Sequence, residues 1–132
     1  LRMLLKRLII KLTRLAKEQL IKEEMTDAQI ELIRQFNFLV DIHFREKKSV
    51  KEYAELLHKS PKTLSNLFKI YQQKTPLRII HERIVLEARR LLTYTDKSVK
   101  EIGFELGFEE AATFHKLFKK ITGQSPKAFR EG

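Results

Sequence analysis

The sequence contains no cysteine among its 132 residues, and only four glycines and three prolines. Without cysteine there is no disulfide framework and no thiolate metal site. The apolar cluster near the start, LLKRLIIKL, is interrupted by three basic residues, and no run approaches the roughly 18 apolar residues that a membrane span needs. No small-residue cleavage site follows, so a secretory signal is not indicated either. We therefore expect a cytoplasmic protein.

Patterns that carry catalysis or bind metal are also missing. The four histidines fall on different predicted helices without a carboxylate at metal-ligand spacing, whereas a zinc site needs several convergent ligands. They are His43, His58, His81 and His115. There is no Ser/His/Asp or Cys/His arrangement, no glycine-rich phosphate loop and no paired carboxylates. We predict no enzymatic activity, no metal and no cofactor.

Positive charge is what the sequence has in excess: 27 Lys and Arg against 17 Asp and Glu give a net charge of +10. A small basic domain most often meets a polyanion, either nucleic acid or an acidic membrane surface. The alternative is that the charge only keeps the surface soluble. The hydrophobic share of 42% and charged share of 33% are typical of a soluble helical protein.

Helix-start signals recur along the chain, whereas strand signals are weak. Three dipeptides place a capping hydroxyl before a proline at the first helical position: Ser60-Pro61, Thr75-Pro76 and Ser125-Pro126. Three capping boxes begin at Thr26, Ser49 and Ser98. We predict an all-α fold with helices near 1–22, 27–45, 50–57, 61–72, 77–92, 99–106 and 110–121, and a short one from 126.

The first predicted helix carries a leucine seam with 4-3-4-3 spacing, formed by Leu1, Leu5, Leu8, Leu12 and Leu15. The seam could pack on the protein's own core, pair with a second copy as a short coiled coil, or lie on an anionic membrane. We favour pairing into a homodimer, and we assign residues 1–25 as a linker or dimerisation helix. Two heptads are short, so pairing would need help from another domain.

The tetrapeptide SVKE occurs at 49–52 and again at 98–101, and the residues that follow each copy also match. With one extra residue in the second copy, Leu67-Phe68-Lys69 aligns with Leu117-Phe118-Lys119, and Thr75-Pro76 aligns with Ser125-Pro126. The chain therefore holds two copies of one unit.

Each copy predicts a short helix, a tight turn and a second helix of about twelve residues, which is the helix-turn-helix pattern. A small residue, Ala54 or Gly103, allows the two helices to cross closely. His58 or Gly107 stands at the turn, where a left-handed conformation is wanted. The helix between the copies buries one face and exposes Glu87 and the arginines. At about 25 Å it could hold the units about one DNA turn apart.

Residues 49–130 resemble the DNA-binding domain of the AraC/XylS family of bacterial transcription regulators. The resemblance rests on R-x4-A-x2-LL from Arg83 to Leu92, on IGFELGF at 102–108, on FHKLFKKITGQSP at 114–126 and on Phe129-Arg130. It implies two recognition helices in successive major grooves, and regulation of transcription, more often activation, through contacts with RNA polymerase. We assign 26–132 as this domain, with helix-turn-helix units at about 49–72 and 98–122.

Three residues depart from the family pattern. Gly103 stands where the family usually has Ala, which inside a helix costs about 1 kcal/mol. Gln73 stands where the first unit often has Gly, as Gly123 does in the second. Glu110 replaces the usual Asp or Ser as cap of the second recognition helix. We expect local effects on stability from these changes.

Base contacts are expected from the start of each recognition helix. In the first unit they are Lys62, Thr63, Ser65 and Asn66, and in the second Ala111, Ala112, Thr113, His115 and Lys116. Because alanine carries little hydrogen-bond information, we expect the first unit to specify sequence more sharply. Candidate phosphate contacts are Lys59, Lys69, Lys74, Arg78, Lys119, Lys120 and Lys127. Arg83 and Arg130 are at least as well explained by a structural role.

Two other classes of function stay open: a helical protein-interaction module without specific DNA readout, and a membrane-surface protein that uses its first helix. The partner that we expect is double-stranded DNA, with no membrane. The chain begins with Leu rather than Met, so we expect that the natural protein carries an N-terminal sensing or dimerising domain.

Overall fold

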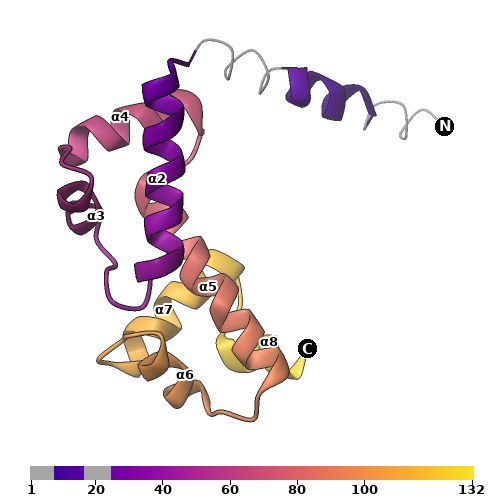
Figure 1. Ribbon diagram of the computed structural model, residues 1–132. Helices are drawn as coiled ribbons and strands as arrows, with labels where there is room; N and C mark the ends of the chain where they lie inside the picture. The colour runs from indigo at the N-terminus through magenta and orange to yellow at the C-terminus, as the bar shows by residue number, and fades with distance from the viewer. Residues whose placement is uncertain (1–7, 17–24) are drawn as a thin grey trace.

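The computed structural model describes residues 8–16 and 25–132, and this part of the chain folds into helices without a strand (Figure 1). Residues 8–16 are helical, and all nine are exposed. The named helices are α2 (Asp27–His43), α3 (Val50–Leu56), α4 (Pro61–Tyr71), α5 (Pro76–Tyr94), α6 (Val99–Glu105), α7 (Ala111–Thr122) and α8 (Pro126–Glu131). The predicted all-α class is confirmed, and every helix predicted after residue 26 is present within one or two residues of its expected ends.

The predicted capping residues begin these helices. Pro61, Pro76 and Pro126 are each the first helical residue after a capping hydroxyl. Thr26 and Ser49 form complete capping boxes with Gln29 and Glu52. At Ser98 only half of the box forms: the Glu101 N–H donates to the serine hydroxyl. Local sequence therefore fixes most helix starts independently of packing.

Helix α5 is the centre of the molecule. It contacts α2 and α4, which precede it in the sequence, and α6, α7 and α8, which follow it (Figure 1). Its side chains Ile80, Ile84 and Ala88 are fully buried, as the helical spacing predicts. At about 1.5 Å per residue, its 19 residues give a rod of about 28 Å on which both units pack.

Each unit has an aromatic centre of its own. In the first unit the Phe36 ring, from α2, packs edge-on against Tyr53 and Phe68, with ring centroids 5.6 and 4.9 Å away. In the second unit Phe108, Phe114, Phe118 and Phe129 follow one another at centroid distances of 5.5 to 6.0 Å. These aromatic contacts, most of them edge-to-face, hold the recognition helices on the elements that support them.

Within the described residues, no helix combines the length and the apolar character needed to cross a membrane.

Candidate nucleic-acid interface

The turn inside each unit is built by the same backbone hydrogen bonds. In the first unit the His58 N–H donates to the Glu55 carbonyl and the Lys59 N–H donates to the Ala54 carbonyl. In the second unit, Gly107 donates to Phe104, and Phe108 donates to Gly103. Both sets form a Schellman motif, which needs a left-handed residue after the helix end.

The predicted left-handed residues occupy those turns. His58 has φ of 55° and Gly107 has φ of 89°. The later pair, Gln73 and Gly123, also has positive φ, at 57° and 84°. The alignment of the two repeats therefore extends from residue identity to backbone conformation.

The small residues permit the expected close crossing. A Cβ placed on Gly103 would lie 3.3 Å from Cδ2 of Phe114, which is tighter than ordinary van der Waals contact. Ala54 of the first unit is fully enclosed as well, with 1% of its surface exposed. The glycine thus brings α6 onto the buried face of α7.

Helix α4 presents its polar face outward. Leu64, Leu67 and Phe68 are buried, whereas the predicted base contacts on the opposite face are all exposed: Lys62, Thr63, Ser65 and Asn66. The Thr63 hydroxyl lies 2.8 Å from the Ser60 hydroxyl, so this side chain also takes part in the helix cap.

Helix α7 is arranged in the same way, with a weaker start. Phe114 and Phe118 are buried, Ala111 is half-buried, and the other predicted base contacts are exposed: Ala112, Thr113, His115 and Lys116. The Glu110 side chain makes no capping hydrogen bond. Only a backbone bond, from the Thr113 N–H to the Glu110 carbonyl, closes the first turn. The first backbone N–H groups of α7 therefore lack the side-chain acceptor that Ser60 supplies to α4.

The seven predicted phosphate contacts are all exposed, but two of them already have a carboxylate partner. Lys74 Nζ and Arg78 Nε each lie 2.9 Å from a carboxylate oxygen of Glu82. The other five form no ion pair among the described residues: Lys59, Lys69, Lys119, Lys120 and Lys127. These five are the stronger candidates for phosphate binding.

His81 of α5 lies close to two positive side chains, Lys120 of α7 and Arg78 of its own helix. Burial, together with the positive charges of Lys120 and Arg78, holds the pKa of His81 below its ordinary value. His81 is therefore neutral at physiological pH, and it adds no charge of its own to this region.

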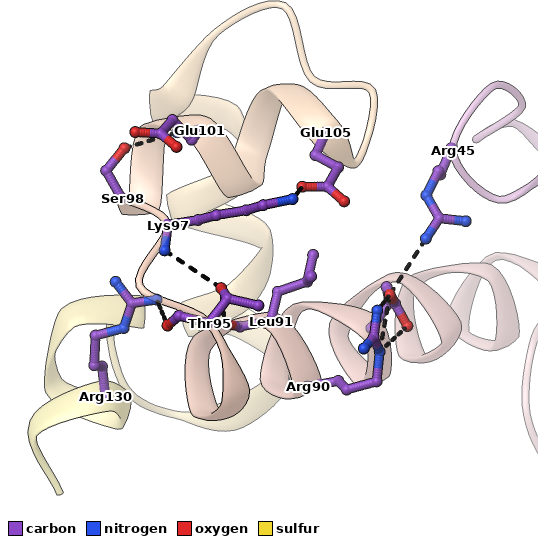
Figure 2. A network of polar contacts seen from close by, with 10 residues as sticks. Arg45, Arg90, Leu91, Thr95, Lys97, Ser98, Glu101, Glu105 and Arg130 are labelled. Carbon is purple, nitrogen blue, oxygen red and sulfur yellow. Dashed lines mark hydrogen bonds and ion pairs between the residues drawn. The ribbon is translucent and has the colours of Figure 1, made fainter.

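Arg83 and Arg130 have structural partners. Arg83 Nε donates to the Asp41 carboxylate at 2.8 Å, and its guanidinium lies 4.3 Å from the Phe44 ring centroid. Arg130 donates to the backbone carbonyls of Leu92 and Thr95, at the end of α5. Figure 2 shows its contact with Thr95. Arg83 thus ties α2 to α5, and Arg130 ties α8 to the end of α5.

Glu87 was expected on an exposed face, and that prediction is wrong. Glu87 is a buried residue of α5, and its carboxylate accepts hydrogen bonds from Arg90 of the same helix and from Arg45, which follows α2. Figure 2 shows how Arg45 and Arg90 approach this position from the two segments. The neighbouring arginines, Arg90 first, hold the pKa of Glu87 below its ordinary value. Helical spacing places Glu87 beside the buried stripe, but it does not reveal that Arg45 comes from 42 residues away.

The leucine seam lies partly outside the described residues, which is the case for Leu1 and Leu5. Leu8, Leu12 and Leu15 are described, and between 52% and 56% of their surface is exposed. In this chain the described leucines therefore do not pack on its core. Among the described residues no group of three or more His, Asp or Glu side chains is placed to hold a metal ion.

Comparisons with known proteins agree with this geometry. A sequence model of the family described as "Helix-turn-helix domain" matches residues 53–132. The chain is 33% identical over 110 residues to the bifunctional transcriptional activator/DNA repair enzyme AdaA of Bacillus subtilis, covering 83% of this chain and 51% of that protein. It is 34% identical over 122 residues to the HTH-type transcriptional activator RhaS of Escherichia fergusonii, covering 92% of this chain and 43% of that protein. The chain thus spans about half the length of these relatives.

Solved structures show the same fold. The DNA-binding domain of AdpA, the global transcriptional factor, solved in complex with a target DNA, is similar with a TM-score of 0.65 and 27% identity, over 80% of this chain and 92% of that one. The C-terminal domain of AraT, a response regulator from Geobacillus stearothermophilus, is similar with a TM-score of 0.72 and 24% identity, over 82% of this chain and 87% of that one.

Proposed function

The chain belongs to the AraC/XylS family of helix-turn-helix DNA-binding proteins, and from this premise we propose that it reads a specific duplex sequence with α4 and α7 in successive major grooves. The observation that carries the proposal is the repeat itself. Two units with identical turn hydrogen bonds each present a helix with a polar, exposed outer face. A major groove admits one such helix, and two units on one rod suit a site of about two helical turns.

The first unit supplies most of the sequence information in this proposal. Lys62 can donate to guanine O6 and N7, and Asn66 can make a bidentate contact to adenine. In the second unit Ala112 and Thr113 offer methyl groups to thymine, while His115 and Lys116 offer donors. The five unpaired lysines neutralise phosphates and position both helices.

The proposal is tested by selecting bound sequences from a random duplex pool and sequencing them, at two salt concentrations. We expect two short blocks about 10 base pairs apart, with the block read by α4 the more sharply defined. One block alone would show that the second unit only holds the backbone. Binding without any enriched sequence would instead support a helical interaction module.

We further propose that the whole protein regulates transcription in the cytoplasm, as an activator that contacts RNA polymerase. The support is the names of its relatives: RhaS is named a transcriptional activator, and AdaA a transcriptional activator that is also a repair enzyme. The part of the chain matched by the family model is the helix-turn-helix part, and our proposal includes no catalytic step. A reporter gene behind the selected site should rise in expression when the intact protein is present, and a fall would mark a repressor.

Pairing of two copies through the leucine seam is a separate proposal. It is supported by the exposure of Leu8, Leu12 and Leu15, because removing large apolar side chains from water against a partner is favourable. Sedimentation velocity of the chain, beside a variant with these three leucines changed to Ser, tests it. A wild-type dimer that the substitutions convert to a monomer supports pairing, whereas two monomers contradict it.

A further inference from the structure

We propose that the loop after α2, residues 44–48, together with the turn of the second unit, fixes the spacing between the two recognition helices, with Gly107 and Lys48 as positioning residues. The inference rests on the two-groove binding proposed above and adds the feature that sets its geometry. In sequence the loop lies directly before the first unit, whereas the turn belongs to the second unit.

Gly107 brings the turn of the second unit into direct contact with the loop that leads into the first unit. A Cβ on this residue would lie 1.8 Å from the Arg45 carbonyl oxygen and 2.5 Å from Lys48 Nζ. The turn alone does not demand this glycine, because the equivalent residue of the first unit is His58, which has positive φ and an exposed side chain. The contact with the loop is what leaves no room for a side chain.

Lys48 closes the same contact from the other side. Its Nζ donates to the Arg45 carbonyl at 2.6 Å and lies 5.0 Å from the centroid of the Phe108 ring. Phe108 is buried and directly follows Gly107 in the turn of the second unit. Lys48 is half-buried, and partial burial lowers its pKa.

The loop is anchored to the first unit and to the central helix as well. The backbone N–H of Lys48 donates to the Glu52 carboxylate, the acidic member of the α3 capping box. The Arg45 guanidinium lies 3.2 Å from the carboxylate of Glu87 on α5 (Figure 2). The loop therefore joins α3, α5 and the second turn.

These anchors bear on DNA recognition through the spacing of the site. Units that share only one helix retain freedom to rotate against each other. One added base pair moves the second half-site by about 3.4 Å and rotates it by about 35°. A locked pair of units rejects such a site, whereas a loose pair accepts it, so the contact makes the protein selective for spacing.

The test uses the full chain and the site selected by the wild type, synthesised with its two blocks one or two base pairs closer or farther apart. Binding is measured by fluorescence anisotropy for wild type, Lys48→Met and Gly107→Ala. The preference is the ratio of the affinity for the best spacing to the affinity for a spacing one or two base pairs different. We expect this ratio to be about three- to tenfold smaller in each variant than in the wild type. Affinity for a duplex carrying only the α4 block should stay unchanged, which a general loss of folding would not permit.

Two matched controls isolate the contact. Gly123→Ala carries the same positive φ, 84° against 89°, but a Cβ there meets nothing within 4 Å. Lys100→Met removes an ammonium that lies 5.9 Å from the Phe104 ring within α6, and so matches the charge change of Lys48→Met. Both controls should keep the wild-type spacing preference.

The outcomes separate this inference from the proposed function. A wild type that selects no two-block site overturns two-groove binding, and the inference with it. A wild type with one preferred spacing that Lys48→Met and Gly107→Ala both retain overturns the inference alone. If circular dichroism shows that Gly107→Ala does not fold, Lys48→Met decides by itself, because it leaves the turn unaltered.

Discussion

Glu87 is the one charged residue that is buried within residues 8–16 and 25–132, and it lies on α5 between Arg45 and Arg90. Its partners Arg45 and Arg90 keep 43% and 57% of their side-chain surface exposed, so solvent screens the pairs in part. The carboxylate itself has left water and depends on the arginines for its hydrogen bonds. At the residue scale, this is the position where a change of charge should be felt most.

Glu87→Gln should lower the free energy of unfolding at neutral pH by about 1–2 kcal/mol, because the ion pairs of the carboxylate with Arg45 and Arg90 are replaced by weaker hydrogen bonds to a neutral amide oxygen. The pKa of Glu87 is held below its ordinary value of 4.5 in the folded state, so its contribution is complete above pH 4.5. That contribution is lost as the pH falls through the lowered folded value. Urea unfolding of both proteins, at neutral pH and in steps below pH 4.5, should show the difference shrinking in acid. The exposed pair of Glu31 and Arg34 supplies the control, because Glu31→Gln should change little.

Lys62→Ala and Asn66→Ala should each weaken binding to the selected site by about 1–3 kcal/mol and relax the preference at one base position. Thr113→Ala in the second unit should cost less, because a methyl contact discriminates less than a bidentate hydrogen bond. Repeating the selection with each variant measures both effects. Equal broadening of the two blocks would contradict the unequal roles that we assign to the units.

At the scale of elements, the two recognition helices differ in the residues that cap their N-termini. Helix α4 is capped by Ser60, whose hydroxyl accepts a hydrogen bond from the Thr63 N–H, and its first helical residue is a proline. The capping position of α7 is Glu110, whose side chain accepts no such bond. Because capping contributes about 1 kcal/mol, α7 should fray at its start more readily than α4.

Glu110→Ser should therefore stabilise the chain by about 0.5–1 kcal/mol. It also removes a negative charge from the end of a helix that we place in a DNA groove, so the affinity for the selected site should rise. Thermal unfolding and anisotropy titrations measure the two effects separately. Glu109→Ser is the matched control, because it removes the same charge one residue before the capping position. Equal stabilisation by both substitutions would show that charge, and not the cap, is responsible.

At the scale of the whole molecule, the positive charge of the chain is not all available to DNA. Lys74 and Arg78 are engaged by Glu82, and Arg45, Arg83 and Arg90 are engaged by carboxylates on or beside α5. The lysines near α4 and α7 that form no ion pair with another described residue remain as the basis of salt-dependent binding.

Changing both Lys119 and Lys120 to Ala should reduce the slope of log affinity against log salt by about 1–2, since each phosphate contact contributes about 0.9. The loss of affinity should be similar for all sequences, because phosphate contacts carry no base information. Lys74→Ala should change the slope less, since this side chain already pairs with Glu82. Anisotropy titrations over a range of salt give the slopes, and a larger change for Lys74→Ala would contradict this division of the charges.

The sequence by itself determined the all-α class, the helix ends and the repeat, because these depend on local signals. Caps, prolines at the first helical position, and left-handed residues act over a few neighbours, so His58, Gly107 and Glu110 could be interpreted without knowing the fold. The outward faces of α4 and α7 followed from helical spacing for the same reason. That these faces touch DNA bases remains a prediction.

Only the tertiary structure decided which distant residues meet. No local sequence pattern indicates that Glu87 is buried and bonded to Arg45, or that Arg83 pairs with Asp41, since the residues of each pair are 42 positions apart in the sequence. Gly107 shows the division most clearly. The sequence explains its positive φ through the turn, but its second role, as the place where the Arg45 carbonyl approaches, exists only once both units pack on α5. Contacts between units depend on the packing of the whole chain, and short-range patterns carry no record of them.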